Sequence, residues 1–393
     1  MTKNRNAAAG RSLSPVRDVT RSRQITPMTR VLLAVRAGGR CQFGNHNKYL
    51  FRHGLTFTEG NFAEAAHIVA FRQRGPRGRA ARLTKAQINA VGNLMLLCPD
   101  CHTLIDRAPE SHPATKLRMM KQQHEQRILV QTAAGPEQMT RLVALTATID
   151  RRPIHLSMPQ LSEAIAPRWA DPCAGLFIDL TTLDVASRTS FYRQATRVVD
   201  QQLSRFNQAS LGEAPRAHLS VFGLAPMPLL MHFGSRLSDK VSTDLFQRHR
   251  SGSWRWRKRG PRLRFLPRTL RTGTDAGHVA LVLSLSGVVQ LHRLSPALDE
   301  RFTVYELTVE SPTPVLLRTR ADLEVFQEAY LTQLAAISRA HPHARELHVI
   351  PAVPAPAAIT CGRALFSRAS PPLVVYDLDE TGNHYVQTLR IRP

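Results

Sequence analysis

The sequence predicts a protein of class α/β, with a small N-terminal domain and a larger, internally duplicated C-terminal domain. Three observations support this division. Three of the five cysteines lie between positions 41 and 101, strands and long helices alternate from about residue 171 to the end, and one short pattern occurs twice in that region. At 393 residues, the chain is long enough for two or three domains with separate cores.

The cysteines are distributed unevenly. Cys41, Cys98 and Cys101 lie in the N-terminal part, whereas Cys173 and Cys361 each stand alone. An odd total that includes a Cys-x-x-Cys pair favours metal ligation in a reducing compartment over a disulfide framework. We expect the two solitary cysteines to be buried small hydrophobic residues.

The chain is strongly basic. It has 53 Lys and Arg residues against 29 acidic ones, which gives a formal net charge of +24. Such a balance indicates a polyanionic partner. An anionic membrane surface would also attract it, but the sequence has no run of about 18 apolar residues and no signal-peptide pattern. We therefore expect a cytoplasmic protein with no membrane partner.

The N-terminal region divides into an arm and a domain. Residues 1–28 are basic with little apolar periodicity, which predicts a disordered arm. The domain, 29–132, is predicted to begin with a helix over 29–37 and to end with a helix over 113–130. Between them lies an apolar stretch over 62–71 that reads as a strand.

A basic loop follows this strand. Glycine and proline interrupt it, and it carries four arginines: Arg72, Arg74, Arg77 and Arg79. A solvated surface loop would have the same composition. Its position beside the strand favours contact with DNA phosphates.

The C-terminal region alternates strands and helices. After a Pro- and Gly-spaced stretch that we expect to be a linker, 133–170, apolar runs predict strands at 175–180, 218–222, 279–285, 302–309, 347–350 and 373–376. Long helices are predicted at 186–206 and 321–340. The order strand, long helix, strand therefore occurs twice, which is typical of α/β domains.

The duplication can be followed residue by residue. A Pro-x-Pro pattern with glycine at the same interval occurs over Pro226–Gly234 and again over Pro354–Gly362. Each proline pair suits a strand-to-helix turn, because proline pre-sets φ for the first turn of a helix. The sequence thus predicts two α/β halves, 171–275 and 276–393, with a ligand cleft between them at the carboxyl ends of the strands.

The N-terminal motif is the most specific feature of the chain. Ala66-His67-Ile68 precedes Asn93-Leu94-Met95-Leu96-Leu97-Cys98-Pro99-Asp100-Cys101-His102, and residues 41–106 resemble the HNH nucleases, a ββα-metal fold. The resemblance implies that His67 is the general base. It implies that Asn93 orients this histidine or assists at the metal, and that His102 ligates a catalytic divalent ion such as Mg²⁺.

Two positions depart from the family pattern. Many HNH domains have an acid or histidine before the base, where this chain has Ala66; Glu64 is the nearest carboxylate and a candidate second metal ligand. Zinc-bearing HNH domains usually supply two Cys-x-x-Cys pairs, whereas Cys41 stands alone beside Cys98 and Cys101. The fourth ligand of a structural zinc would then be His46, with His53 as the alternative, or a group from elsewhere in the chain.

The duplicated region also resembles a known family. Four segments resemble the SAVED domain, a cyclic-oligonucleotide sensor, and the resemblance implies two fused Rossmann-like halves related to those of CARF proteins. The segments are Phe177-Ile178-Asp179-Leu180-Thr181, Ala225 to Leu237, Phe246-Gln247-Arg248 with Trp254-Arg255-Trp256, and Leu281 to Gly287. Joined to an HNH domain, this region resembles the HNH-SAVED effectors of bacterial CBASS anti-phage systems.

Candidate ligand-binding residues follow from position and chemistry. Hydroxyls and backbone N–H groups at a strand end suit a phosphate, two alternating tryptophans suit base stacking, although they are equally typical of a core pair, and arginine suits a phosphate. The candidates are Asp179, Thr181, Arg248, Trp254, Trp256, Ser284, Ser286 and Gly287.

These observations together predict a ligand-gated endonuclease. A cyclic di- or trinucleotide would bind the sensor and drive assembly into a dimer or tetramer that hydrolyses double-stranded DNA. Two alternatives remain open at this point. One is an HNH restriction enzyme that depends on DNA modification, and the other is a zinc-containing DNA-binding regulator without cleavage.

Overall fold

The computed structural model describes residues 24–44, 46–80, 83–149, 156–183, 187–209, 218–237, 240–365, 370–379 and 381–392. The chain forms two compact units, Met1–Ala133 and Ala134–Pro393. Most of the arm predicted at 1–28 lies outside the described residues. None of the described helices is both long and apolar enough to cross a membrane.

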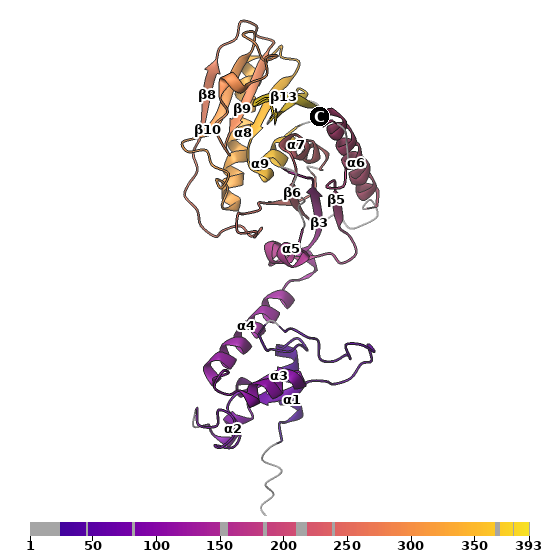
Figure 1. The fold of residues 1–393 in the computed structure, drawn as a ribbon, viewed down its shortest axis with the longest axis vertical. Helices are drawn as coiled ribbons and strands as arrows, with labels where there is room; N and C mark the ends of the chain where they lie inside the picture. The colour runs from indigo at the N-terminus through magenta and orange to yellow at the C-terminus, as the bar shows by residue number, and fades with distance from the viewer. Residues whose placement is uncertain are drawn as a thin grey trace, which may run out of the picture. The chain divides into compact units, whose positions relative to one another are not determined.

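The first unit combines a two-stranded sheet with helices, which are labelled α1 to α4 in Figure 1. Its elements are α1 (Pro27–Arg36), β1 (Glu64–His67), α2 (Lys85–Ile88), β2 (Leu94–Leu97), α3 (Pro99–Arg107) and α4 (Ala114–Thr132), with a 3₁₀ turn at Val91–Asn93. The helices predicted at 29–37 and 113–130 correspond to α1 and α4. Helix α1 begins slightly earlier than expected, because the Thr26 side chain accepts a hydrogen bond from the Thr29 N–H and Pro27 suits the first turn.

Strands β1 and β2 pair antiparallel, with Glu64 opposite Leu97 and His67 opposite Leu94. Every residue of β2 is buried, so this strand forms the centre of the small core. Cys98 follows β2 as the N-cap residue of α3, and Pro99 occupies the first position of that helix. The result is the ββα arrangement that the resemblance implies.

The second unit contains two sheets and five helices within its described residues (Figure 1). Its strands are β3 (Met139–Thr146), β4 (Trp169–Ala170), β5 (Leu176–Asp179), β6 (Leu219–Leu224), β7 (Thr243–Phe246), β8 (Phe265–Arg271), β9 (Val279–Ser284), β10 (Thr303–Val309), β11 (Leu347–Ala352), β12 (Leu373–Asp379) and β13 (His384–Ile391). Its helices are α5 (Met158–Ile165), α6 (Arg188–Ala209), α7 (Met227–Arg236), α8 (Arg320–Ala340) and α9 (Ala355–Arg363), and 3₁₀ turns lie at Pro136–Gln138 and Leu291–Arg293.

The first sheet is parallel, in the order β4-β3-β6-β7, with β5 also paired to β3. Strand β3 is its central strand, and seven of its eight residues are buried. The expectation that 133–170 is a linker is therefore wrong, since this stretch supplies β3, α5 and β4. Of its described Pro and Gly residues, Gly135 and Pro136 begin the 3₁₀ turn before β3, Pro159 lies in the first turn of α5, and Pro167 lies between α5 and β4.

The second sheet has the order β13-β12-β11-β9-β10-β8, in which β9 to β12 are parallel and the two edge strands are antiparallel. Strand β8 precedes residue 276 but belongs to this sheet, so the predicted boundary between the halves is too late. All six strands predicted from apolar runs are present, as are both long helices. Of the solitary cysteines, Cys361 is buried as expected, whereas Cys173 is exposed.

The repeated Pro-x-Pro…Gly pattern marks the contact between the two halves. Pro226 and Pro354 are the N-caps of α7 and α9, which follow β6 and β11. A side chain at Gly234 would lie 2.1 Å from the Ile359 carbonyl oxygen, and one at Gly362 would lie 1.9 Å from that of Met231. The glycines thus let the two helices cross backbone to backbone, and one continuous apolar core joins both sheets.

Candidate functional site

Cys41, His46, Cys98 and Cys101 form a compact cluster whose potential ligand atoms all lie within 4.8 Å of one another. The His46 Nδ1 is 3.3 Å from the Cys101 sulfur and 3.6 Å from that of Cys98. His53 lies outside the cluster and contacts Thr56 instead. His46 therefore takes the fourth place, as the sequence favoured.

Local structure brings the four residues together. Cys98 and Cys101 flank the start of α3, and the turn after α1 brings Cys41 alongside β2. That turn passes through Gly38 and Gly39, whose positive φ angles favour glycine. The buried Gln42 then exchanges hydrogen bonds with Leu96: its backbone N–H donates to the Leu96 carbonyl, and its side-chain oxygen accepts from the Leu96 N–H.

The donor set suits a soft divalent cation. Burial raises the pKa of the Cys41 and Cys101 thiols, because removing a thiolate from water is costly. Three thiols and one imidazole in a closed, largely buried group match the Cys₃His sets of structural zinc sites, and a bound cation would offset the cost of the thiolates. The cluster is thus compatible with zinc.

His67 ends β1 and is half-buried. Its Nε2 lies 3.0 Å from the side-chain oxygen of Asn89, which follows α2. An amide oxygen only accepts hydrogen bonds, so this contact requires the proton on Nε2 and leaves the lone pair of Nδ1 free. Sequence reasoning missed Asn89, which lies outside the HNH motif.

Asn93 does not contact the His67 ring, contrary to one of the expected roles. Its side-chain oxygen accepts from the Val69 N–H, and its amide nitrogen donates to the carbonyls of Val69 and Ile88. Its own carbonyl accepts from the Ile68 N–H. The buried asparagine therefore fixes the backbone that leaves β1, and it acts on His67 only through that backbone.

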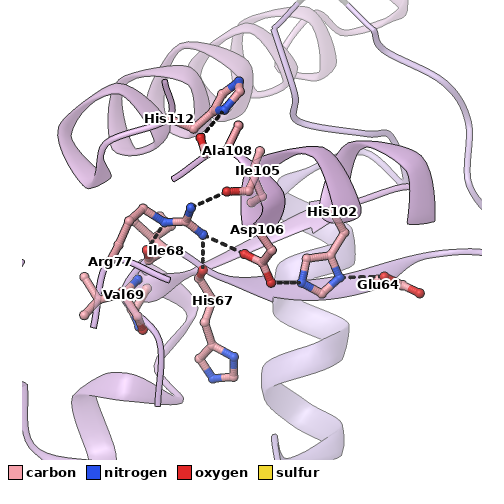
Figure 2. Close-up of polar contacts among 11 residues, drawn as sticks. Glu64, His67, Ile68, Val69, Arg77, His102, Ile105, Asp106, Ala108 and His112 are labelled. Carbon is pink, nitrogen blue, oxygen red and sulfur yellow. Dashed lines mark hydrogen bonds and ion pairs between the residues drawn. The ribbon is translucent and has the colours of Figure 1, made fainter. Parts of the chain in front are cut away.

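His102 lies between two carboxylates (Figure 2). Its Nδ1 is 2.5 Å from a carboxylate oxygen of Glu64, and its Nε2 is 3.5 Å from one of Asp106. Glu64 shares a face of β1 with Ala66, because side chains alternate along a strand. The signal for Asp106 was available in the sequence, since it follows His102 by four residues on one helix face.

Arg77 joins the strand of His67 to the helix of His102 (Figure 2). Its guanidinium donates to the Ile68 carbonyl at 2.8 Å, to the Ile105 carbonyl at 2.5 Å and to the Asp106 carboxylate at 2.9 Å. Only 4% of this side chain is exposed. The expectation that Arg77 contacts DNA is therefore wrong, because its donors are used inside the domain.

The other three arginines of the loop, Arg72, Arg74 and Arg79, are exposed. Arg72 also lines an open cavity of about 430 Å³ together with His67, Ala70, Phe71 and Gly75. These three side chains are exposed, and their contact with DNA phosphates stays a prediction. The cavity makes the His67 side chain accessible to a ligand.

Two family models match the chain. Residues 41–108 match the model described as HNH endonuclease, and residues 200–391 match SAVED, described as the SMODS-associated and fused to various effectors sensor domain. The chain joins an HNH endonuclease domain to a SAVED sensor domain. Among curated proteins, no match was found.

Solved structures with a similar arrangement are Cap4 SAVED/CARF-domain containing receptors. The Acinetobacter baumannii receptor with the cyclic trinucleotide 3'3'3'-cAAA is 10% identical with a TM-score of 0.45, and the match covers 74% of this chain and 62% of the receptor. The same receptor with 2'3'3'-cAAA is 10% identical with a TM-score of 0.42, covering 80% and 63%. The Moraxella osloensis receptor is 11% identical with a TM-score of 0.34, covering 80% and 62%. The chain thus spans less than two thirds of the length of these receptors.

The second unit keeps several of the predicted ligand residues at its surface. Asp179 ends β5 and accepts hydrogen bonds from both the N–H and the hydroxyl of Thr181, at 2.9 and 2.7 Å. Ser286 and Gly287 follow β9 and are half-buried, but the Ser286 N–H donates to the Ala352 carbonyl. Arg248, after β7, is half-buried as well.

Three predicted ligand residues are used in the SAVED core instead. Trp254 is 2% exposed and meets Phe222 edge to face, so it offers no face to a base. The indole N–H of Trp256 donates to the Leu245 carbonyl, and its ring packs on the same core. Ser284 is fully buried, and its hydroxyl accepts from the Val289 N–H. Apolar side chains at alternate positions indicate a core pair as readily as a stacking platform, and here the core pair is correct.

Proposed function

We propose that this protein is a cyclic-oligonucleotide-activated, metal-dependent endonuclease that degrades double-stranded DNA in a CBASS-type anti-phage response. The observation that carries the proposal is the arrangement of His67, Glu64 and His102 in a domain of the HNH family, within one chain that also contains a SAVED sensor. The basic charge of the chain supports a nucleic-acid substrate.

His67 is the general base in this proposal. With Nε2 protonated against Asn89, its Nδ1 can accept a proton from the water that attacks the scissile phosphate. Asn89 fixes the tautomer and the ring orientation. Arg77 and Asn93 hold the backbone on either side of the turn that presents this histidine.

Glu64 and His102 would hold the catalytic divalent ion. One carboxylate and one imidazole are few ligands, but Mg²⁺ keeps several waters and also binds substrate phosphates. When bound, such an ion stabilises the charge on the phosphate and the leaving oxygen. An Asp106 carboxylate oxygen lies 3.5 Å from the other nitrogen of His102 and would orient its ring, as outer carboxylates do for histidine ligands.

Zinc in the Cys41, His46, Cys98 and Cys101 cluster would have a structural role. The cluster ties the start of α3 to the segment after α1, and α3 carries His102. Helix α3 would therefore carry both a ligand of the structural zinc, Cys101, and a ligand of the catalytic ion, His102.

Gating follows from the second domain. A cyclic di- or trinucleotide would bind at the carboxyl ends of the strands of the SAVED domain, near Asp179, Thr181, Arg248, Ser286 or Gly287, and favour an active homo-oligomer. An ungated nuclease would also damage the DNA of the cell that makes it. The site of action would be the bacterial cytoplasm.

The test is plasmid cleavage by the purified chain in Mg²⁺, with and without a panel of cyclic di- and trinucleotides. We expect one cyclic nucleotide to start degradation, and both His67→Ala and Glu64→Gln to abolish it. Cleavage that needs no cyclic nucleotide would show that the nuclease is not gated by one. Cleavage that depends on DNA methylation would favour a restriction enzyme. Unchanged cleavage by His67→Ala would show that His67 is not the general base.

A further inference from the structure

The connection between β7 and β8 carries a strong positive charge on the SAVED domain. No acidic residue lies between Asp244 and Asp275, and the exposed cations over residues 250–264 are Arg250, Arg255, Arg257, Lys258, Arg259, Arg262 and Arg264. Within the described part of the chain, none of these seven side chains forms an ion pair. We call residues 250–264 the basic strap.

The basic strap is held in place by its apolar residues. Trp254 is buried, the Trp256 indole is hydrogen-bonded to the Leu245 carbonyl at 3.0 Å, and Leu263 packs against the main core. The Arg257 N–H also donates to the Arg318 carbonyl at 2.9 Å. These contacts pack the basic strap onto the domain, so it is not a loose surface loop.

The anchors also decide which side chains face solvent. In extended backbone, successive side chains point to opposite sides, so inward Trp254 and Trp256 turn Arg255 and Arg257 outward. Beyond Pro261 the pattern repeats, with Leu263 inward and the exposed Arg262 beside it. The basic strap therefore presents a fixed row of cations.

The amount of charge selects the partner. Alternate residues of an extended chain lie about 6.6 Å apart, which is shorter than the Debye length of about 8 Å at physiological salt, so unpaired cations in such a row repel one another. A cyclic di- or trinucleotide has only two or three phosphates for the seven exposed cations. Duplex DNA carries about one negative charge per 1.7 Å of its axis and can neutralise the whole row.

We propose that the basic strap is a DNA-binding surface of the SAVED domain, separate from the HNH domain, that holds the phosphate backbone of the substrate duplex. The choice of DNA as the polyanion rests on the proposed function. Strand β8, which follows the strap, is an outer strand of its sheet (Figure 1) and continues the surface with the exposed Arg268. The chain would then bind DNA through two domains and cut it with one.

The experiment measures binding of the full chain to a short fluorescent DNA duplex by anisotropy over a range of salt. All proteins carry His67→Ala and are kept free of added divalent ions, so the result does not depend on cleavage. The test variant is Arg255→Gln/Arg257→Gln/Arg262→Gln. We expect weaker binding at low salt and a plot of log affinity against log salt that is shallower by about two to three units, because each phosphate contact contributes about 0.9.

A matched control removes the same charge from helix α6 of the second unit. The control variant, Arg193→Gln/Arg197→Gln/Arg205→Gln, changes three exposed arginines and should keep the slope of the unchanged chain. Equal losses in both variants would mean that net charge alone matters, and an unchanged slope in the strap variant would mean that DNA does not bind there. Either result overturns the proposal. Loss of cyclic-trinucleotide binding with unchanged DNA binding also overturns it, since the strap would then belong to the sensor pocket.

Discussion

Arg77 shows how one side chain can connect the two parts of a catalytic site. The Arg77 backbone has a positive φ of 57°, which is unusual for a residue other than glycine. The guanidinium compensates by donating to carbonyls on both sides of the site and to Asp106. The strained loop therefore serves the internal contacts, and the charge of the loop alone did not reveal this.

Replacing Arg77 by lysine should cost both stability and activity. Lysine keeps the charge but lacks the planar fork, so buried carbonyls of Ile68 and Ile105 lose their donors. We expect the free energy of unfolding of the nuclease unit to fall by about 2 to 4 kcal/mol and cleavage to fall at least about tenfold. Thermal unfolding and plasmid cleavage check this. The control, Arg79→Lys, changes an exposed neighbour and should stay within about 0.5 kcal/mol; equal effects of the two changes would contradict the internal role of Arg77.

Asn89 offers a sharper test of the base. Asn89→Ala should lower the cleavage rate by about 10- to 100-fold while the protein stays folded, because the His67 ring loses the acceptor that fixes its tautomer. Asn89→Asp keeps an acceptor and should recover most of the rate. A failure of aspartate to rescue cleavage would show that Asn89 acts elsewhere.

Individual residues were predictable where a motif constrains several of them at once. His67, His102 and the three cysteines follow from order and spacing, and His46 follows from the four ligands that zinc requires. Asn89 and the inward turn of Arg77 were not predictable in this way. Both depend on how the loop and α2 fold back over β1, which no local pattern records.

At the scale of elements, the crossing of α7 and α9 is the feature that the duplicated sequence encodes most directly. Each glycine faces a carbonyl oxygen of the opposite helix at a distance that no side chain allows. The prolines at Pro226 and Pro354 begin the helices, and the glycines eight residues later let them meet. Repetition of the motif thus indicates an approximate two-fold contact inside one chain.

Adding one methyl group at this crossing should separate the helices. We expect Gly234→Ala or Gly362→Ala to lower the free energy of unfolding of the second unit by about 3 kcal/mol or more, since backbone cannot yield as a side chain can. Gly287→Ala is the control, because its new methyl group would meet nothing within 4 Å. Chemical unfolding followed by tryptophan fluorescence measures all three. Wild-type stability of Gly362→Ala would show that the helices are not in backbone contact in solution.

Some elements were predictable from sequence and others were not. Continuous apolar runs indicated the central strands β6, β9, β10 and β11, which are buried on both faces. Edge strands gave weaker signals: β8 contains Pro267 and the exposed Arg268, and proline and charged residues are common in edge strands. Strand β3 is apolar, but the Pro and Gly around it suggested a linker. Its place in the sheet depends on pairing with distant strands.

At the scale of the whole molecule, the chain has two compact units, and the unfolding of each can be followed separately. All three tryptophans, Trp169, Trp254 and Trp256, belong to the second unit, so tryptophan fluorescence reports on the sensor alone. Calorimetry reports on both units. The metal cluster belongs entirely to the first unit.

Removal of zinc should therefore unfold one unit and spare the other. Structural zinc contributes directly to folding, so we expect about one zinc per purified chain and a chelator that lowers the calorimetric transition of the nuclease unit. The tryptophan-detected transition should not move. Cys98→Ser should reproduce the effect of the chelator, whereas Cys173→Ser, at an exposed cysteine outside the cluster, should leave both transitions and the zinc content unchanged. If chelation shifted the tryptophan transition as well, the units would unfold together, and the metal would stabilise the sensor as much as the nuclease.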